Sequence, residues 1–466
     1  MCLVVGFMTL LDVSIVNVAL PSIQRGLQAS SSDLQWVVSG YALTFGLLLV
    51  PSGRLGDVRG RTTMFLVGLV TFVLASAACG VANGPMWLVI ARLVQGAAGG
   101  ILNPQVSGFV QELFRGKERG TAFGLFGATI GISTAVGPLA GGLLIQLFGV
   151  EHGWRAVFFV NVPIGIVAFV LALMWLPRAS VQRRSESLDP VGVVLLGTSV
   201  VLLLLPLVQE RTWSGGAKWL LIPAGLVVLA AFVGWEIRYG RAGKQPMVQL
   251  DLFRLRSYSF GSAIGLVYFA GFTAIFFVLA LYLQIGRGYS ALEAGLAVTP
   301  FALGSAVASA LAGGVVLRFG RPLVAIGLAV VIVGLLITDV VLSRVTSSAV
   351  GWATALPLLV SGLGSGVVIS PNITLTLQEV PVARAGSASG VLQTGQRLGA
   401  AVGIAAVGSL FFNRLATTHG DWEQAVTAAL RLCDILVALA LVVALADLRW
   451  GSRPQGADRQ PAQTAA

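Results

Sequence analysis

The stretch Gly53-Arg54-Leu55-Gly56-Asp57-Val58-Arg59-Gly60-Arg61 forms a charged, glycine-containing turn between two long apolar runs. A looser copy, Gly313-Gly314-Val315-Val316-Leu317-Arg318-Phe319-Gly320-Arg321, follows about 260 residues further along, again between apolar runs. An apolar chain that repeats one loop in its two halves is typical of transporters built from duplicated helical bundles. The second copy has Leu317 where the first has Asp57, so the halves are not expected to be equivalent at this turn.

The composition indicates a membrane protein. Of the 466 residues, 56% are hydrophobic and 11% are charged, whereas soluble proteins carry about 25% charged residues. The net charge of +11 comes from short basic clusters between apolar stretches, which argues against a nucleic-acid-binding face. Cys2, Cys79 and Cys433 lie in apolar surroundings without paired spacing, so a disulfide framework and a metal site are not expected. No cofactor is expected either.

The apolar stretches predict about fourteen transmembrane helices, because a helix needs about 20 apolar residues to cross the hydrocarbon core. These stretches are too long and too uniformly apolar for barrel strands. The predicted spans are residues 1–20, 35–53, 62–82, 87–110, 121–148, 154–176, 190–208, 218–237, 258–284, 292–317, 322–343, 350–371, 385–411 and 425–448.

The basic residues predict the orientation. Most arginines and lysines fall in the loops on the side of the two glycine-arginine turns, so these loops and both termini are expected to be cytoplasmic. The first span lacks a basic leader and a small-x-small cleavage site, so a cleaved signal peptide is not expected. It starts almost at the membrane without a polar leader, and we expect the natural start to lie further upstream.

Asp12 stands in the middle of the first span, where a carboxylate normally faces a cavity or a partner. One hypothesis is a site that binds and releases a proton as its surroundings change from wet to dry. The alternative is a permanently paired aspartate that fixes helix packing. Asn17 lies beside the same helical face.

Arg92 lies too deep in its span to reach the membrane surface easily. Gln95 and Gly96 follow on the same helical face, and the glycine allows a neighbouring helix to come close. We expect Arg92 to be the counter-charge of Asp12; the alternative is an arginine that donates to backbone carbonyls at a broken helix.

A fourth pattern, Gly137-Pro138-Leu139-Ala140-Gly141-Gly142, lies late in the fifth span. Proline removes a helix hydrogen bond and glycine removes side-chain bulk, so a bend and tight packing are expected there. In the turn Gly53–Arg61, Asp57 can pair with Arg61 or cap a helix N-terminus, and Arg54 and Arg59 can reach acidic groups or carbonyl ends across the bundle interface. The alternative is ordinary topogenic positive charge.

At these residues the chain resembles the major facilitator superfamily. Within it, the chain is similar to the fourteen-span branch of drug:proton antiporters, a group rich in bacterial multidrug and antibiotic exporters. Gly53–Arg61 resembles motif A, Asp12–Pro21 the first-span motif of this branch, Arg92–Gly100 motif B and Gly137–Gly142 motif C, which the family associates with export. Ser133 departs from the small glycine often found four residues before Gly137.

The resemblance implies an all-α fold with two six-helix bundles, residues 1–176 and 258–450. It places an extra helical hairpin at 188–238 and a disordered cytoplasmic tail at 451–466. It also implies alternating access, with Asp12 as the proton carrier and Arg92 as its partner. Asn17, Gln95 and Gly96 would support this pair. The hinge would comprise Gly137, Pro138, Gly141 and Gly142. The cytoplasmic gate would comprise Gly53, Arg54, Asp57, Arg59, Gly60 and Arg61.

The substrate cavity is expected to use aromatic and polar side chains near mid-span. The candidates are Trp36, Tyr41, Phe45, Asn103, Tyr268, Phe272, Gln284, Asn372, Gln393 and Arg397. Asp434 is expected to be neutralised by Arg431, three residues before it, so the second half offers little free negative charge. This favours neutral, anionic or amphipathic substrates.

The sequence thus predicts a secondary active transporter, not an enzyme, of the plasma membrane. Its expected function is the proton-coupled efflux of hydrophobic or amphipathic compounds such as antibiotics, by a chain expected to act as a monomer in the bilayer. The alternatives are a proton-coupled importer, a dedicated exporter of one metabolite, and a non-transporting membrane sensor. No nucleophile–base set and no Walker-type ATP loop stands in the sequence.

Overall fold

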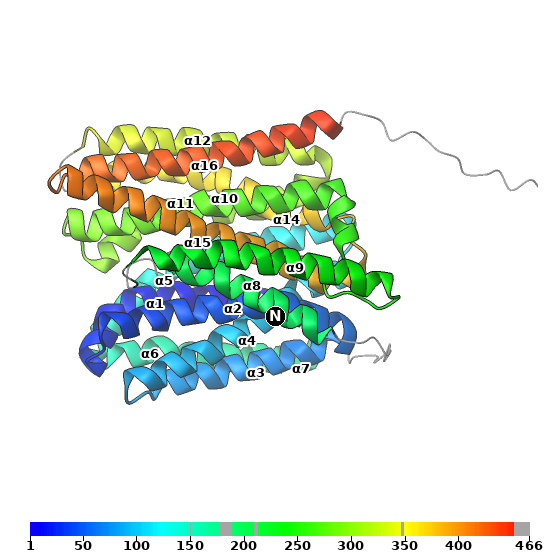
Figure 1. Cartoon of the computed structure of the whole chain (residues 1–466). Coiled ribbons are helices and arrows are strands. Elements are labelled where there is room, and N and C mark those ends of the chain that lie inside the picture. The colour runs from blue at the N-terminus through cyan, green and yellow to red at the C-terminus, as the bar shows by residue number, and fades with distance from the viewer. Residues whose placement is uncertain (150, 177–188, 209–212, 214, 346–348, 452–466) are drawn as a thin grey trace, which may run out of the picture.

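The structure is a computed structural model that describes residues 1–149, 151–176, 189–208, 213, 215–345 and 349–451. It is a helical membrane protein in which the helices run nearly parallel (Figure 1). Fourteen helices in the described part are long and apolar enough to cross a membrane, which confirms the predicted fold class. The tail expected beyond residue 451 lies outside the described residues.

Two sets of helices form the two bundles. The N-terminal bundle comprises α1 (Cys2–Leu27), α2 (Ser31–Arg59), α3 (Arg61–Gly80), α4 (Pro85–Leu113), α5 (Gly116–Phe148), α6 (Gly153–Phe159) and α7 (Asn161–Trp175). The C-terminal bundle comprises α10 (Arg256–Leu281), η3 (Tyr282–Gly286), α11 (Ala291–Phe319), α12 (Arg321–Leu342), α13 (Val350–Ala353), α14 (Ala355–Leu377), η4 (Val382–Arg384), α15 (Ala385–Thr417) and α16 (Trp422–Gly451).

An extra hairpin lies between the bundles in the chain. It consists of α8 (Pro190–Val208) and α9 (Leu221–Arg241), with short 3-10 segments η1 (Gly216–Leu220) and η2 (Leu250–Arg254). Helix α8 packs against both α2 and α15, and the hairpin lies across the junction of the two bundles in Figure 1. The hairpin therefore covers one side of the seam between the halves.

Several helices extend further than the apolar runs predict. Helix α1 continues through Pro21 to Leu27, and α14 continues through Pro371 to Leu377. Proline is tolerated inside membrane helices because neighbouring groups satisfy the freed backbone carbonyl. The predicted sixth span is instead divided at Val160 into α6 and α7.

The internal repeat is wider than the glycine-arginine turn. Helices α2 and α11 each start with a capping box, formed by Ser30 with Asp33 and by Ser290 with Glu293. Each ends at a glycine with positive φ, Gly60 at 100° and Gly320 at 60°, a backbone conformation that other residues rarely adopt. Equivalent helices are thus started and stopped by equivalent residues in the two halves.

The two bundles meet along two seams, α2 with α15 and α5 with α11. We call the end of the molecule where α2 and α11 finish the arginine-rich end, after Arg59, Arg61, Arg318 and Arg321. Hydrogen bonds that cross between the bundles gather at this end. They include Arg61 Nη2 to the Val382 carbonyl (2.6 Å) and Arg119 Nη2 to the Gln378 carbonyl (3.4 Å).

Candidate functional site

A buried ion pair lies at the centre of the N-terminal bundle. Asp12 is fully buried, and its Oδ2 accepts from Arg92 Nη1 at 2.6 Å. Its Oδ1 accepts from Gln95 Nε2 at 2.8 Å and from Asn161 Nδ2 at 2.7 Å. The expected pairing of Asp12 with Arg92 is confirmed.

The pair satisfies the general requirement that charges inside a membrane protein be paired and hydrogen-bonded. Arg92 also donates through Nε to the Val37 carbonyl (3.1 Å) and lies over the Tyr41 ring, 4.2 Å from its centroid. The arginine therefore uses both partners that the sequence offered as alternatives, the carboxylate and a backbone carbonyl.

Asn161 was missed in the sequence analysis. It is the first residue of α7, directly after the break in the sixth span, and it also donates to Ser76 Oγ at 3.0 Å. Asn161 lies inside the predicted span 154–176, where a polar side chain among apolar residues was the signal that could have found it.

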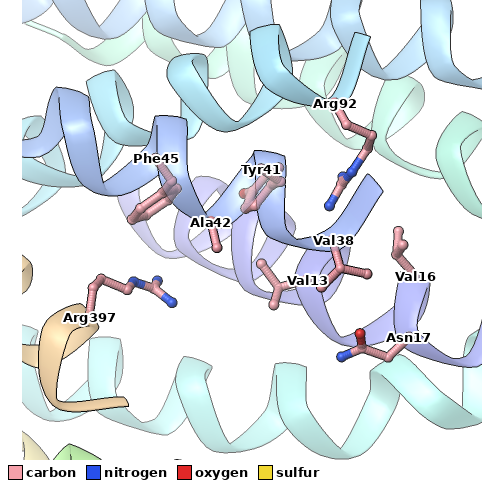
Figure 2. Close-up of a pocket in the computed structure, with 9 residues that line it drawn as sticks. All are labelled: Val13, Val16, Asn17, Val38, Tyr41, Ala42, Phe45, Arg92 and Arg397. Carbon is pink, nitrogen blue, oxygen red and sulfur yellow. The ribbon is translucent and has the colours of Figure 1, made fainter. Parts of the chain in front are cut away.

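A small cavity lies next to the pair, between the bundles. Its volume is about 60 Å³, enough for a few water molecules and well below the roughly 300–1,000 Å³ of a drug-sized site. The lining residues are Val13, Val16, Asn17, Val38, Tyr41, Ala42, Phe45, Arg92 and Arg397 (Figure 2). Asp12 is not among them, but its partner Arg92 is.

Three of the substrate candidates line this cavity: Tyr41 and Phe45 from α2, and Arg397 from α15. The Arg397 guanidinium lies over the Phe45 ring, 4.4 Å from its centroid. Asn17 also lines the cavity, whereas Gly96 brings α4 so close to α2 that an added Cβ would overlap the Tyr41 carbonyl oxygen.

Four other substrate candidates make their contacts outside the cavity. Asn103 donates to the Gly99 carbonyl of its own helix at 3.1 Å. Tyr268 donates to Ser365 Oγ at 2.8 Å and stacks on Phe272 in the C-terminal core. Asn372 accepts from Arg321 at 3.1 Å.

Three further candidates also lie outside the cavity lining. Gln393 donates to Ser107 Oγ at 3.4 Å across the seam, while Trp36 is half-buried and Gln284 is exposed.

The acidic groups of the C-terminal bundle are paired differently from expectation. Arg431 Nε pairs with Asp339 Oδ2 at 3.1 Å, so the expected neutralisation of Asp434 by Arg431 is wrong. The arginine reaches across to α12 instead of along its own helix.

The turn Gly53–Arg61 closes the arginine-rich end of the α2/α15 seam. Asp57 pairs with Arg61 at 2.9 Å and accepts from the backbone N–H groups of Gly386 (3.1 Å) and Ser387 (3.0 Å), in the first turn of α15. The two expectations for Asp57, an ion pair and a helix cap, are both met. Anionic groups are favourable at a helix N-terminus because of its free N–H groups and the helix dipole.

Other residues of the turn support this closure. An added Cβ on Gly53 would overlap the Gly386 carbonyl oxygen, so the helices touch there through backbone alone. Arg61 also pairs with Glu112 at 2.8 Å, and Arg54 donates to Gln245 Oε1 at 2.9 Å. Arg59 is exposed.

The glycine-proline pattern of α5 packs in two directions. Gly137 and Gly141 face Ser14 and Ile15 of α1, whereas a Cβ added to Gly295 of α11 would lie 3.0 Å from Pro138 Cβ. Gly142 has open space, with its nearest neighbour 4.0 Å from an added Cβ. Helix α5 is thus held between α1 and the second bundle.

Two helical bundles around a central cavity, with a buried ion pair beside it, define a membrane transporter that moves small molecules. The family model of the Major Facilitator Superfamily matches residues 2–404. The chain belongs to the major facilitator superfamily, whose members are transporters of small molecules and not enzymes.

The relatives by sequence include named exporters. The chain is 41% identical over 413 residues (88% of this chain, 71% of the relative) to a probable actinorhodin transporter of Streptomyces coelicolor. It is 33% identical over 424 residues (90% and 76%) to the tetracenomycin C resistance and export protein of Streptomyces glaucescens. It is also 33% identical over 426 residues (90% and 76%) to the multidrug resistance protein Stp of Mycobacterium tuberculosis.

Solved structures share the fold at low sequence identity. The proton:xylose symporter XylE aligns with a TM-score of 0.67 at 15% identity, over 97% of this chain and 94% of that chain. The human organic anion transporter MFSD10 aligns with a TM-score of 0.65 at 14% identity, over 95% and 98%. At such identities the likeness supports the fold alone.

Proposed function

We propose that the protein exports hydrophobic or amphipathic compounds, antibiotics among them, in exchange for protons by alternating access. The observation that carries the proposal is the buried pair of Asp12 and Arg92 beside a cavity between two bundles. Relatives whose names describe antibiotic and multidrug export support the direction and the substrate class.

In this proposal Asp12 carries the proton and Arg92 responds to it. While Asp12 is ionised, three donors hold it, and one of them, Arg92, also lines the cavity. Protonation removes the attraction for the guanidinium, so Arg92 is released and α4 can move relative to α1. Asn17, Gln95 and Gly96 hold the surrounding helices, and Gly137, Pro138, Gly141 and Gly142 form the hinge in α5.

The proposed orientation places the arginine-rich end and both termini in the cytoplasm, because most basic loop residues lie at that end. The turn Gly53–Arg61 is then the cytoplasmic gate, closed in this conformation. The cavity lies beyond that closure, since residues 38–45 of α2 line it and residues 53–57 form the seal. The conformation therefore corresponds to a state sealed from the cytoplasm. The proposal further includes that the chain acts as a monomer in the plasma membrane.

The test is dye movement in everted membrane vesicles energised to acidify their interior. Ethidium and a neutral dye are followed in parallel for the wild type and Asp12→Asn. Gradient-dependent accumulation by the wild type that collapses in Asp12→Asn supports antiport with coupling on α1. Uptake in the mutant equal to that of the wild type would remove Asp12 from coupling, and dye loss in place of accumulation would support the importer.

A further inference from the structure

Two arginines line the cavity, Arg92 and Arg397, and they differ in whether they have an anionic partner. Arg92 is neutralised by Asp12 at 2.6 Å. In the described part of the chain, the Arg397 guanidinium has neither a carboxylate nor a hydrogen-bond acceptor as partner; its contact is the face of Phe45 at 4.4 Å. Because the Asp12–Arg92 pair is neutral as a whole, Arg397 gives the cavity a net positive charge.

A second polar group of the cavity is also unsatisfied. The Tyr41 hydroxyl is buried and has no hydrogen-bond partner among the described residues, although Tyr41 lines the cavity. Tyr41 and Phe45 are one helical turn apart on α2, with ring centroids 5.9 Å apart. Figure 2 shows Tyr41 and Phe45 on α2, with Arg397 extending towards them from α15, so the hydroxyl and the cation line the same cavity from different helices.

Buried polar groups without partners are costly, and native structures keep them chiefly where a ligand, an ion or water completes them. Apart from Asn17 and the paired Arg92, the other lining residues are apolar: Val13, Val16, Val38 and Ala42. A guanidinium presents several N–H donors in one plane, and this arrangement fits the two oxygens of a carboxylate. It can also donate to a single phenolate oxygen, to which the Tyr41 hydroxyl would donate as well. The same charge repels a cation that has no counter-charge in the cavity.

We propose that Arg397 and the Tyr41 hydroxyl bind the anionic group of an aromatic substrate, a phenolate or a carboxylate, while Phe45 stacks on its ring. The cavity therefore selects organic anions over cations of the same shape. This inference rests on the proposed export function, and it names the substrate class of the same site. Because the cavity is small in this conformation, the bundles separate around Arg397 as the substrate enters.

The test compares two dyes with the same xanthene ring system and opposite charge: fluorescein, an anion slightly above neutral pH, and tetramethylrhodamine ethyl ester, a cation. Binding to purified protein in nanodiscs is measured by fluorescence anisotropy, without any gradient. Gradient-driven transport of both dyes is measured separately in proteoliposomes. The variants are Arg397→Gln, Arg397→Lys, Tyr41→Phe and, as matched control, Arg414→Gln, which removes an exposed arginine from the same helix.

The wild type is expected to bind fluorescein more tightly than the rhodamine. Arg397→Gln should weaken fluorescein binding by about tenfold or more, the range for a lost charge-assisted hydrogen bond, and should leave or improve rhodamine binding. Arg397→Lys should keep the preference with lower affinity, because it keeps the charge and loses the planar fork. Tyr41→Phe should weaken fluorescein alone, and Arg414→Gln should change neither dye.

Two results would overturn the inference. One is a wild type that prefers the rhodamine; the other is an Arg397→Gln variant that folds and keeps the wild-type ratio of the two affinities. In the second case, an accompanying loss of proton-driven transport of both dyes would assign Arg397 to coupling instead. The proposed function fails separately: a charge-dependent binding ratio without gradient-driven movement of either dye contradicts proton antiport and leaves the anion site standing.

Discussion

Substituting Asp57 by asparagine should unseal the arginine-rich end. The Asp57 side chain is 1% exposed and accepts two hydrogen bonds from α15, at 3.1 Å from Gly386 and 3.0 Å from Ser387. Asparagine keeps one acceptor oxygen and turns the other position into a donor that faces N–H groups, so at least one of these bonds is lost. A hydrogen bond to a charged group contributes about 1.5–3 kcal/mol, which shifts the equilibrium towards the open gate by roughly 10- to 150-fold.

The opening can be followed with spin labels on the outermost helices of the two bundles. Trp175→Cys and Arg449→Cys place exposed labels at the arginine-rich ends of α7 and α16, on opposite sides of the molecule (Figure 1). The native cysteines Cys2, Cys79 and Cys433 are replaced first. Pulsed electron spin resonance should show a longer-distance population that grows in Asp57→Asn.

The matched control is Asp251→Asn. It removes a carboxylate that is 78% exposed and whose contact with Arg254 is 3.8 Å long, so its expected contribution is close to zero. The distance distribution should stay that of the wild type. If Asp57→Asn also leaves the distribution unchanged, the hydrogen bonds of Asp57 to α15 do not hold the arginine-rich end closed.

Three other perturbations test the centre of the molecule. Arg92→Gln leaves a buried carboxylate without its cation and should destabilise the protein by about 3–5 kcal/mol. The double variant with Asp12→Asn should recover most of the melting temperature in detergent, but it should not restore proton-driven transport. Gly137→Ala places a methyl group against Ser14 and should cost about 1–3 kcal/mol, whereas Gly142→Ala, with 4.0 Å of space, should melt like the wild type. Asn161→Val removes one donor to Asp12 and should lower the melting temperature more than a surface substitution does; equal melting would show that this bond contributes nothing.

The central pair could be predicted because its chemistry is rare in a membrane span. A carboxylate and a guanidinium in apolar helices need each other, and Gln95 follows Arg92 at a spacing that shares its face. Asn161 carries no charge, and although it lies inside the predicted span 154–176, one amide among apolar residues does not indicate which helix it faces. The ion pair was predictable, and its third donor was not.

The cavity lining was predictable only in part, for a different reason. Val13, Val38 and Ala42 look like lipid-facing residues in the sequence, since apolar side chains suit lipid, core and cavity alike. Asn103 and Asn372 were candidates because they are polar, yet they are satisfied inside their own bundles. Which polar group remains unsatisfied depends on tertiary packing, and that is what distinguishes Tyr41 and Arg397.

The two copies of the turn show which part of the repeat serves packing. At the glycine that opens each copy, helices from different bundles touch: Gly53 meets Gly386 of α15, and Gly313 meets Gly120 of α5. Bulk at either position would separate the bundles, so the small residue is needed in both halves.

The charge differs because the facing helices start at different places. Gly386 is the second residue of α15, where backbone N–H groups are still free, and Asp57 binds them. Gly120 is the fifth residue of α5, where the amide is already bonded within the helix.

The last arginine of the second copy makes its contacts within its own bundle. Arg321 pairs with Asp447 of α16 at 3.0 Å and donates to Asn372 of α14 at 3.1 Å. Arg61, its counterpart, reaches the Val382 carbonyl of the other bundle. Among the described residues, the duplicated turn therefore contributes backbone packing at the α5/α11 seam and, at the α2/α15 seam, both packing and the charged contacts of Asp57 and Arg61. A charged latch of this kind can be released by protonation or by a competing ion.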